Sequence, residues 1–471
     1  MLDNNEEDLE RLAELCLSTA KQIKQHLAST GQPQMSFDQN GPPFFPHATS
    51  PLDIQLARLD LRAAAKRLYD LVSGPDEVVA YNTYNITHDL NAFHYVNHYS
   101  IASAVPLDSS ISYSALATAL SLDTKQLRQM LRQLIQIHVF HEPTPNEVAH
   151  TASSKLLITH SGVAAFNAYI SRDVFPMAVK QVEALEHFGH GNQHPHEAGL
   201  NFACGTDLPM YAYYESPGQS GVRGRFSQLM TYVSSFPAMD KEHAAHGFAW
   251  DALPADSVVV DIAGNVGHCS IQIARTNPSV RIIVQDLPKI VARATDPATS
   301  VIPPELRDRF TFQEHDFYAP QPVKHAAVYF LRMIMHDYSD AYCLKILRRI
   351  VPSMAPSSRI VIMDQVSPPV GVVPSAIERM MRTQDLQMML LTNARERDAA
   401  EWQELIAGVV VDDDGDGNES VDDQVLSTKT TRKLEIKNIV SPQGSTMSLI
   451  EVGFVDDVVP VANGVSDTSA E

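Results

Sequence analysis

The sequence predicts an α/β protein in which a mostly α-helical N-terminal domain precedes a C-terminal domain built on a parallel β-sheet. Two observations predict this fold class. Residues 8 to 27 and 52 to 74 carry apolar side chains at the spacing of amphipathic helices. From Ser257 onward, apolar runs of strand length alternate with helical segments, which is typical of parallel strands covered by helices on both faces.

The length and composition indicate a globular protein of more than one domain. The chain has 471 residues, of which 44% are hydrophobic and 20% are charged, and this is enough apolar mass for two or three cores. We expect a helical arm and linker over residues 1 to 50, a second domain over 51 to 175 and a third over 176 to 471.

The charge balance and the N-terminus disfavour several classes of partner. A formal net charge of -20 opposes binding to nucleic acid or to an anionic membrane. The N-terminus lacks the basic and apolar regions of a secretion signal, and no run reaches roughly 18 apolar residues, the length that crosses a membrane. The scattered cysteines suit a reducing compartment, so we expect a cytoplasmic protein. They are Cys16, Cys204, Cys269 and Cys343.

The segment after the arm and its Pro- and Gly-rich linker has the element order of a winged helix. Residues 101 to 158 predict a short helix, a second helix and then an extended hairpin. The second helix carries Lys125, Arg128 and Arg132 on one face, as the DNA-reading helix of a transcription regulator would. The acidic net charge disfavours that alternative, and we expect instead a module that forms a homodimer.

Four apolar runs define the predicted sheet: SVVVDIA, RIIVQDLP, AAVYFLR and SRIVIMDQV. Each is followed by a helical segment, as in a Rossmann-like fold. In such sheets the ligand binds beyond the carboxyl ends of the strands, so the residues that follow each run are the candidates for a binding site.

The first two runs end in residues that suit a nucleoside. Asp261, Gly264 and Gly267 lie in a strand-to-helix turn, where glycine lets the backbone approach a ligand closely. Asp286 ends the next strand, where a carboxylate can accept both ribose hydroxyls. The full dinucleotide pattern GxGxxG is absent, so a nucleoside without a pyrophosphate fits better than a nicotinamide cofactor.

Further polar residues follow the later strands. Asp316 and Phe317 come after the third strand region, where a carboxylate can accept the adenine amino group and a ring can lie against the base. Arg332 ends the AAVYFLR strand, and His336 follows at the expected start of a helix. Two more carboxylates lie at strand or loop ends, namely Asp364 and Glu396.

The order and wording of these segments resemble the cation-independent O-methyltransferases of the caffeic acid O-methyltransferase type, especially fungal members that methylate aromatic polyketides. The resemblance covers roughly residues 60 to 455 of the chain. It rests on VAHTASSKLL, RFSQLMTYVS, VQDLP, HDFYAPQPV, YFLRMIMHDYSD, CLKILRRIVPSM and NARERDAAEW.

This resemblance implies a class I methyltransferase domain over residues 176 to 471 that binds S-adenosylmethionine, after a winged-helix dimerisation domain. It implies that the general base is His336, oriented by Asp364 and Glu396. The cofactor-binding residues would be Asp261, Gly264, Gly267, Asp286, Asp316, Phe317, Arg332 and Ser234. A small aromatic acceptor would lie against Phe226 and Met230, and would also bind Asn393.

Two features depart from the family pattern. The glycine-rich loop usually reads DxGGGxG, whereas Ala263 and Asn265 replace two of the glycines here. Ala263 would weaken cofactor binding if its position needs a positive φ. An acidic loop is also inserted over residues 412 to 423. It begins like a calcium loop but has no glutamate at the twelfth position, so we expect a solvated loop.

A histidine-rich segment offers a possible zinc site, because its histidines recur at spacings of three and four. They are His187, His190, His194 and His196. No cysteine or paired carboxylate completes a ligand set, so we expect a solvated loop between domains and no metal.

The expected reaction places one demand on the protein. A phenol has a pKa of about 10 and must lose its proton to become a good nucleophile, and a histidine of pKa about 6.5 can take that proton near neutral pH. An alternative keeps the fold and changes the chemistry: some fungal proteins that resemble this family catalyse pericyclic reactions. The presence of His336, Asp364 and Glu396 favours methyl transfer.

Overall fold

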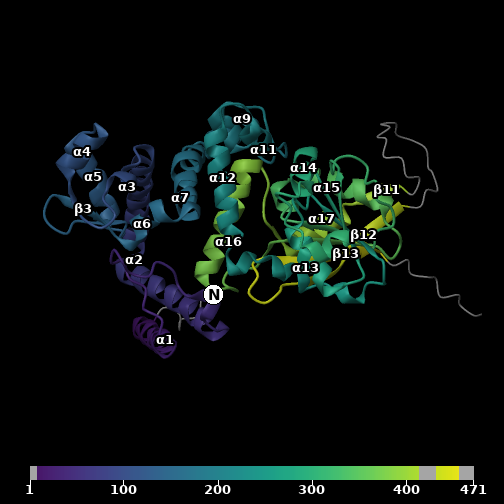
Figure 1. Cartoon of the computed structure of the whole chain (residues 1–471), viewed down its shortest axis with the longest axis horizontal. Coiled ribbons are helices and arrows are strands. Elements are labelled where there is room, and N and C mark those ends of the chain that lie inside the picture. The colour runs from purple at the N-terminus through teal and green to yellow at the C-terminus, as the bar shows by residue number, and fades with distance from the viewer. Residues whose placement is uncertain (1–7, 413–430, 456–471) are drawn as a thin grey trace, which may run out of the picture. The chain divides into compact units, whose positions relative to one another are not determined.

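The computed structural model describes residues 8 to 412 and 431 to 455 and divides the chain into two compact units (Figure 1). Unit 1 contains residues 1 to 240, 336 to 339 and 367 to 398, and unit 2 contains the remainder. The chain therefore crosses from one unit to the other several times. These units do not follow the boundary expected at residue 176, and the expected functional domains remain a prediction.

The N-terminal part of unit 1 begins with two packed helices. Helix α1 (Leu9–Ser29) starts where the Asp8 side chain accepts the Arg11 backbone N–H at 2.9 Å. It packs against helix α2 (Leu52–His98), and their shared core includes Ile23, Leu27 and Ile54. Both predicted helices are confirmed.

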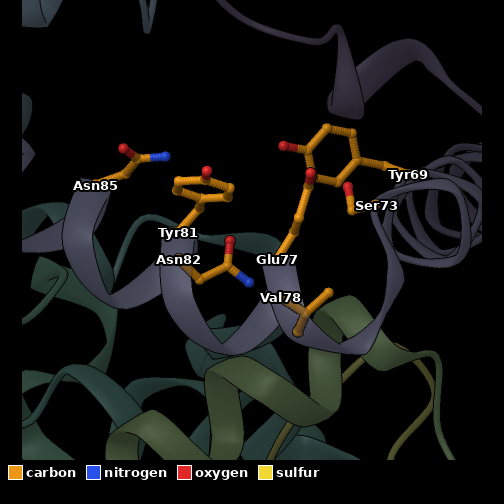
Figure 2. A pocket seen from close by; sticks show the side chains of 7 residues that line it. All are labelled: Tyr69, Ser73, Glu77, Val78, Tyr81, Asn82 and Asn85. Atoms are coloured by element: carbon orange, nitrogen blue, oxygen red, sulfur yellow. The ribbon is translucent and has the colours of Figure 1, made fainter.

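Helix α2 is kinked and exposes many apolar side chains. Gly74 adopts φ 80° and ψ 161° inside it, directly before Pro75, whose ring cannot continue a regular helix. A shallow pocket lies at this kink (Figure 2). Its lining comes entirely from α2, and includes Tyr69 and Tyr81, which are 60% and 57% exposed. The single chain thus leaves aromatic surface uncovered along this helix.

The next segment contains the two predicted helices and the predicted hairpin, and adds two further short helices and one short strand. The elements are α3 (Ile101–Ala104), β1 (Ile111–Ser112), α4 (Tyr113–Leu120), α5 (Thr124–Ile135), β2 (Phe140–His141), β3 (Glu147–His150) and α6 (Ala152–Thr159). Strand β3 lies between β1 and β2 in an antiparallel sheet. The buried face of α5 comprises Leu127, Leu131 and Leu134.

The basic face of α5 contacts the hairpin. Arg132 binds both carboxylate oxygens of Glu142, at 3.0 Å from Nε and 2.9 Å from Nη2. Arg128 donates to the side chain of Asn146 at 3.2 Å. Two of the three side chains that resembled a DNA-reading face therefore bind within the module.

Unit 1 continues through a series of helices that pack around aromatic residues. They are α7 (Ser161–Ala168), the π-helix η3 (Tyr169–Val174), α8 (Phe175–Ala178), α9 (Gln181–Phe188), α10 (Gly199–Cys204), α11 (Met210–Glu215), α12 (Ser220–Val233) and α16 (Ser375–Thr392). Their core contains Tyr169, Tyr214 and Leu390, with Phe226 against it. The short 3-10 helix η8 (Met335–Asp337) contributes its last two residues to this unit.

Unit 2 is built on an eight-stranded sheet of order β11-β12-β13-β8-β7-β4-β5-β6. All four predicted runs are strands: β4 (Val258–Ile262), β5 (Arg281–Asp286), β7 (Val328–Arg332) and β8 (Arg359–Asp364). With β6 (Phe310–Glu314) they are parallel, so their carboxyl ends lie along one edge. The accompanying helices are α13 (His268–Thr276), α14 (Pro288–Thr295), α15 (Asp340–Ile350) and α17 (Ala399–Ala407).

The sheet continues beyond the predicted parallel strands at one edge, where three further strands are antiparallel. Strands β11 (Val410–Asp412), β12 (Thr431–Val440) and β13 (Ser448–Phe454) pair antiparallel to one another, and β13 is antiparallel to β8. A short Pro- and Gly-containing turn joins β12 to β13, which permits a hairpin without a crossover helix. A further small sheet pairs β9 (Val366–Ser367) with β10 (Arg397–Asp398).

Two further predictions from the sequence concern the acidic loop and membrane-spanning segments. The acidic loop falls almost wholly outside the described residues, since only Asp412 at its start belongs to β11. Within the described part of the chain, no helix has the length and apolar character needed to cross a membrane.

Candidate active site

The turn between β4 and α13 requires glycine at two of the predicted positions. A Cβ atom at Gly264 would lie 2.4 Å from the carboxylate of Asp261, closer than any side chain can approach. Gly267 adopts φ 86° as the residue that starts α13, in the left-handed region that favours glycine. The turn therefore brings backbone close to the end of β4, as a cofactor cradle needs.

The two residues that replace glycines in this turn are also left-handed. Ala263 has φ 56° and Asn265 has φ 55°, so Ala263 carries the strain foreseen from the sequence. Two hydrogen bonds offset the cost of the left-handed backbone at Asn265. Its backbone N–H donates to Asp286 Oδ2 at 2.8 Å, and its side-chain oxygen accepts from Arg293 at 2.6 Å. Arg293, on α14, was not singled out in the sequence. Its hydrogen bond to Asn265 stabilises the turn at a position where the family usually has glycine.

Asp286 lies at the carboxyl end of β5 with its carboxylate fixed by backbone. Oδ2 accepts the Asn265 N–H and Oδ1 accepts the Leu287 N–H, each at 2.8 Å. Burial raises the pKa of Asp286, and these two hydrogen bonds and the charge of Arg293 oppose that rise. Each carboxylate oxygen can accept a second hydrogen bond, so the group can still receive two hydroxyls of a ribose.

The remaining residues predicted for the nucleoside also follow strands of unit 2. Asp316 follows β6, and its Oδ1 accepts the Tyr318 N–H at 2.9 Å. The ring of Phe317 lies 4.9 Å from that of Tyr318. Arg332 ends β7, and its positive charge opposes the rise that burial causes in the pKa of Asp261. These predicted residues thus lie within one unit, after parallel strands whose ends share an edge.

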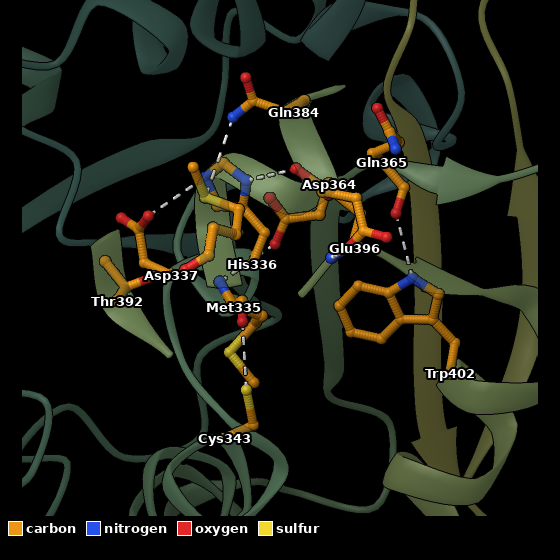
Figure 3. A network of polar contacts seen from close by, with 12 residues as sticks. Met335, His336, Asp337, Cys343, Asp364, Gln365, Gln384, Thr392, Glu396 and Trp402 are labelled. Atoms are coloured by element: carbon orange, nitrogen blue, oxygen red, sulfur yellow. Dashed lines mark hydrogen bonds and ion pairs between the residues drawn. The ribbon is translucent and has the colours of Figure 1, made fainter. Parts of the chain in front are cut away.

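His336 and Glu396, two of the residues predicted for proton transfer, lie in unit 1, where His336 stands between two carboxylates (Figure 3). It belongs to η8, just after β7, and not to the following helix α15, as the sequence had indicated. Its Nδ1 lies 2.9 Å from Glu396 Oε1, and its Nε2 lies 3.8 Å from Asp337 Oδ1. All three residues are buried.

The backbone that carries Glu396 is held by hydrogen bonds. The Glu396 backbone N–H donates to Asp385 Oδ1 at 2.9 Å, and the adjacent Arg397 donates to the Tyr338 carbonyl at 2.9 Å. The second oxygen of Glu396, Oε2, is buried and has no hydrogen-bond partner among the described residues. A carboxylate so enclosed gains strongly from the N–H of the imidazole.

Asp364 ends β8 and acts on the backbone beside the histidine. Its Oδ2 accepts the Met335 N–H at 3.1 Å, which fixes the residue before His336. The sequence predicted that this carboxylate orients the imidazole. The contact with Met335 indicates that Asp364 orients the imidazole indirectly, by fixing the backbone of the preceding residue.

The predicted acceptor residues lie mainly on α12, in an aromatic cluster of unit 1. The ring of Phe226 lies 5.7 Å from Tyr169, 6.1 Å from Tyr211 and 5.4 Å from Tyr214. Met230 follows one turn later, and Ser234 ends the helix as its C-cap. These residues would offer an apolar, aromatic surface to a ligand.

Asn393 has a local role in addition to the predicted one. It ends α16 with φ 55°, and its side-chain nitrogen donates to Asn192 and to the His194 carbonyl. This contact holds the histidine-rich loop, in which the His194 and His196 rings lie 5.5 Å apart. Among the described residues, no group of three or more His, Cys, Asp or Glu side chains could hold a metal ion.

Asp337 and Tyr211 were not singled out from the sequence. Asp337 could have been noticed, because it is an acid adjacent to the candidate base. Tyr211 donates its hydroxyl to Asp337 Oδ2 at 2.7 Å across 126 positions of sequence, and no local pattern marks such a pair.

The buried Asp261 should make stability depend on pH. Burial raises its pKa to about 7, although Ser270 donates to it at 2.5 Å. Because the folded pKa lies above the unfolded one, the contribution of Asp261 to stability is full below about pH 4 and is lost as pH rises through 7. We expect urea titrations to show that the stability of wild type, relative to Asp261→Asn, falls between pH 5 and pH 8. The exposed Asp308→Asn is the control, and an equal difference at both pH values would contradict the prediction.

Comparisons with known proteins identify the family of the chain. Residues 208–409 match the model of an O-methyltransferase domain. O-methyltransferase pgmB of Aspergillus terreus is 33% identical over 447 residues, which cover 94% of this chain and 95% of the relative. O-methyltransferase aurJ of Gibberella zeae is 33% identical over 453 residues, which cover 95% and 97%.

Solved structures share the fold at lower identity. The crystal structure of OxaC matches with a TM-score of 0.67 and 19% identity, over 95% of this chain and 99% of that one. LepI in complex with SAM matches with a TM-score of 0.62 and 21% identity, over 94% and 100%. Because its curated relatives match over nearly their whole length, the chain belongs to the family of S-adenosylmethionine-dependent O-methyltransferases.

Proposed function

We propose that the protein methylates a hydroxyl group of an aromatic, polyketide-like secondary metabolite and that His336 is the general base. The observation that carries this proposal is the hydrogen bond between His336 Nδ1 and the buried carboxylate of Glu396. A carboxylate only accepts, so Nδ1 carries the proton and Nε2 presents its lone pair.

The residues present fit the cofactor. Only glycine fits at Gly264, because a Cβ there would collide with the Asp261 carboxylate, and so the β4–α13 turn stays close to the end of β4. Asp286 presents a fixed carboxylate for the ribose. Asp316 and Phe317 would hold the adenine. The other residues that we propose to line the cofactor are Asp261, Gly267, Arg332 and Ser234. When bound, S-adenosylmethionine supplies a methyl group on a positively charged sulfur, with a neutral thioether as leaving group.

The proton path follows from the imidazole. His336 Nε2 accepts the proton of the acceptor hydroxyl as its oxygen bonds to the methyl carbon, and Glu396 stabilises the imidazolium that forms. Asp364 keeps this ring at a fixed place through Met335. The burial of all these groups excludes water, which strengthens the interaction between the carboxylate and the imidazolium.

The aromatic nature of the acceptor is supported by the cluster around Phe226. A flat, apolar ring gains both buried area and favourable edge-to-face geometry against Phe226 and Tyr211, and the buried Tyr169 and Tyr214 support Phe226 from behind. We propose that Phe226 and Met230 pack against it. Asn393 is proposed to bind the acceptor in addition to the histidine-rich loop.

A pericyclic reaction is the second candidate. It is favoured by the similarity of fold to LepI and to a structure described as a pericyclic reaction enzyme, which matches with a TM-score of 0.61 and 21% identity. Both relations concern the fold alone. Methyl transfer is favoured by the full-length similarity to O-methyltransferases and by the Glu396–His336 pair, which a reaction without proton transfer does not need.

Replacing His336 should abolish most turnover and leave the cofactor bound. We expect His336→Ala to lower kcat about 100- to 10,000-fold, the usual loss for a general base, with little change in the Kd of S-adenosylmethionine. Transfer of label from methyl-labelled cofactor to a panel of phenols gives the rate. The matched control is His187→Ala, an exposed histidine of α9.

The acceptor panel also separates the two candidate reactions. A more acidic phenol should partly restore the rate of His336→Ala, because it needs less help to lose its proton. If the alanine variant methylates at the normal rate, His336 is not the base. If wild type converts a substrate without consuming methyl groups, the pericyclic reaction is the correct one.

Asp286→Ala should weaken binding of S-adenosylmethionine. Hydrogen bonds to a charged group contribute about 1.5 to 3 kcal/mol each, so the Kd should rise at least about tenfold. Calorimetry measures the Kd, and a thermal melt verifies that the variant folds. Asp308→Ala, an exposed change in the same unit, should bind as wild type does. An unchanged Kd for Asp286→Ala would place the ribose elsewhere.

We also propose a homodimer formed through the N-terminal helices. The support is the apolar surface that one chain leaves exposed on α2, including Val72 at 67%, Val79 at 73% and Tyr84 at 66%. We expect light scattering at micromolar concentration to give twice the chain mass and Val79→Glu to lower it. A monomeric wild type would contradict this proposal.

A further inference from the structure

The proposed function leaves a buried acid beside the base without a role. The Oδ1 atom of Asp337 lies 3.8 Å from His336 Nε2, the nitrogen proposed to take the proton. This distance is too long for a hydrogen bond and short enough for a strong electrostatic interaction. The charge on Asp337 therefore affects how firmly Nε2 holds a proton.

The other oxygen of Asp337 is bound by Tyr211, which lies on α11 in the same unit. The Tyr211 hydroxyl donates to Oδ2 at 2.7 Å. The hydroxyl end is enclosed, which raises the pKa of Tyr211 well above its ordinary value, so it remains a donor. The residue as a whole is 47% exposed, and its ring lies 6.1 Å from that of Phe226.

We propose that Tyr211 is a positioning residue that keeps Asp337 ionised and fixed beside His336 Nε2, and so makes His336 a stronger base. This inference rests on the proposed function of His336. Tyr211 would then make two contacts. Its ring lies beside Phe226, which is proposed to pack against the acceptor, and its hydroxyl binds Asp337.

The surroundings of Asp337 make its charge sensitive to this one donor. Burial raises the pKa of Asp337, and the nearby Glu396 raises it further. His336 and the hydrogen bond from Tyr211 lower it. Tyr338, the residue after Asp337, also raises the pKa of Tyr211. If the hydroxyl is removed, the balance moves toward the neutral acid, and a neutral acid does not stabilise an imidazolium.

The test is the pH profile of methyl transfer by Tyr211→Phe. The acidic limb of kcat/KM should move to lower pH by up to about one unit, because His336 loses a stabilising charge. A weaker base should also lower the plateau of kcat, on the order of threefold to tenfold. The Kd of S-adenosylmethionine and the melting temperature verify that the variant folds and binds cofactor.

The control is Tyr213→Phe, the same change on the same helix. The Tyr213 hydroxyl contacts the thiol of Cys204 and not Asp337, so its loss should leave the pH profile in place. A second variant, Asp337→Asn, should reproduce the shift of Tyr211→Phe. In the double variant the two shifts should not add, because both changes remove the same charge.

The outcomes separate this inference from the proposed function. If His336→Ala abolishes turnover but Tyr211→Phe keeps the wild-type pH profile, Tyr211 has no influence on the base and only this inference fails. A lower rate whose pH profile does not shift, or shifts that add in the double variant, would likewise overturn it. If His336→Ala retains full activity, the proposed function itself fails.

Discussion

A single hydrogen bond, from His336 Nδ1 to Glu396 Oε1, determines what the rest of the proposed site can do. Its length of 2.9 Å and the burial of both side chains fix one tautomer of the imidazole. With the proton on Nδ1, the opposite nitrogen is the only basic atom of the ring. In the other tautomer the same residues could not remove a proton from an acceptor.

Several parts of the fold serve to keep this pair in place. The chain leaves β7 and enters η8 within three residues, and Asp364 at the end of β8 fixes the Met335 amide there. Asp385 holds the Glu396 backbone, and Arg397 ties the neighbouring residue to the Tyr338 carbonyl. The segment after the parallel strand β7 thus carries the proposed base, and the segment after α16 carries the carboxylate beside it.

Much of the fold could be predicted because its signals are local. The four apolar runs became strands β4, β5, β7 and β8, since buried parallel strands need continuous apolar sequence. Gly264, Gly267 and Asp286 follow these strands at the expected places. The antiparallel hairpin β12–β13 was not predicted. A long acidic insertion precedes it in the sequence and separates it from the regular alternation of strands and helices.

The parts of the site that escaped prediction depend on contacts distant in sequence. Arg293 supports a turn 28 positions away, and Tyr211 reaches Asp337 over 126 positions. The basic face of α5 shows that a local pattern can also suggest a role that the contacts do not support. Arg132 has the spacing of a DNA-reading residue, but it forms a paired contact with Glu142 across the hairpin.

The state of the imidazole is the most direct test of His336 as the base. Nitrogen-15 NMR of protein labelled at histidine reports which ring nitrogen carries the proton, and the signal of His336 is assigned by its absence from His336→Ala. At neutral pH, the proton should lie on Nδ1 of His336 and be absent from Nε2, and Glu396→Gln should weaken this preference. A proton on Nε2 in wild type would contradict the general-base role.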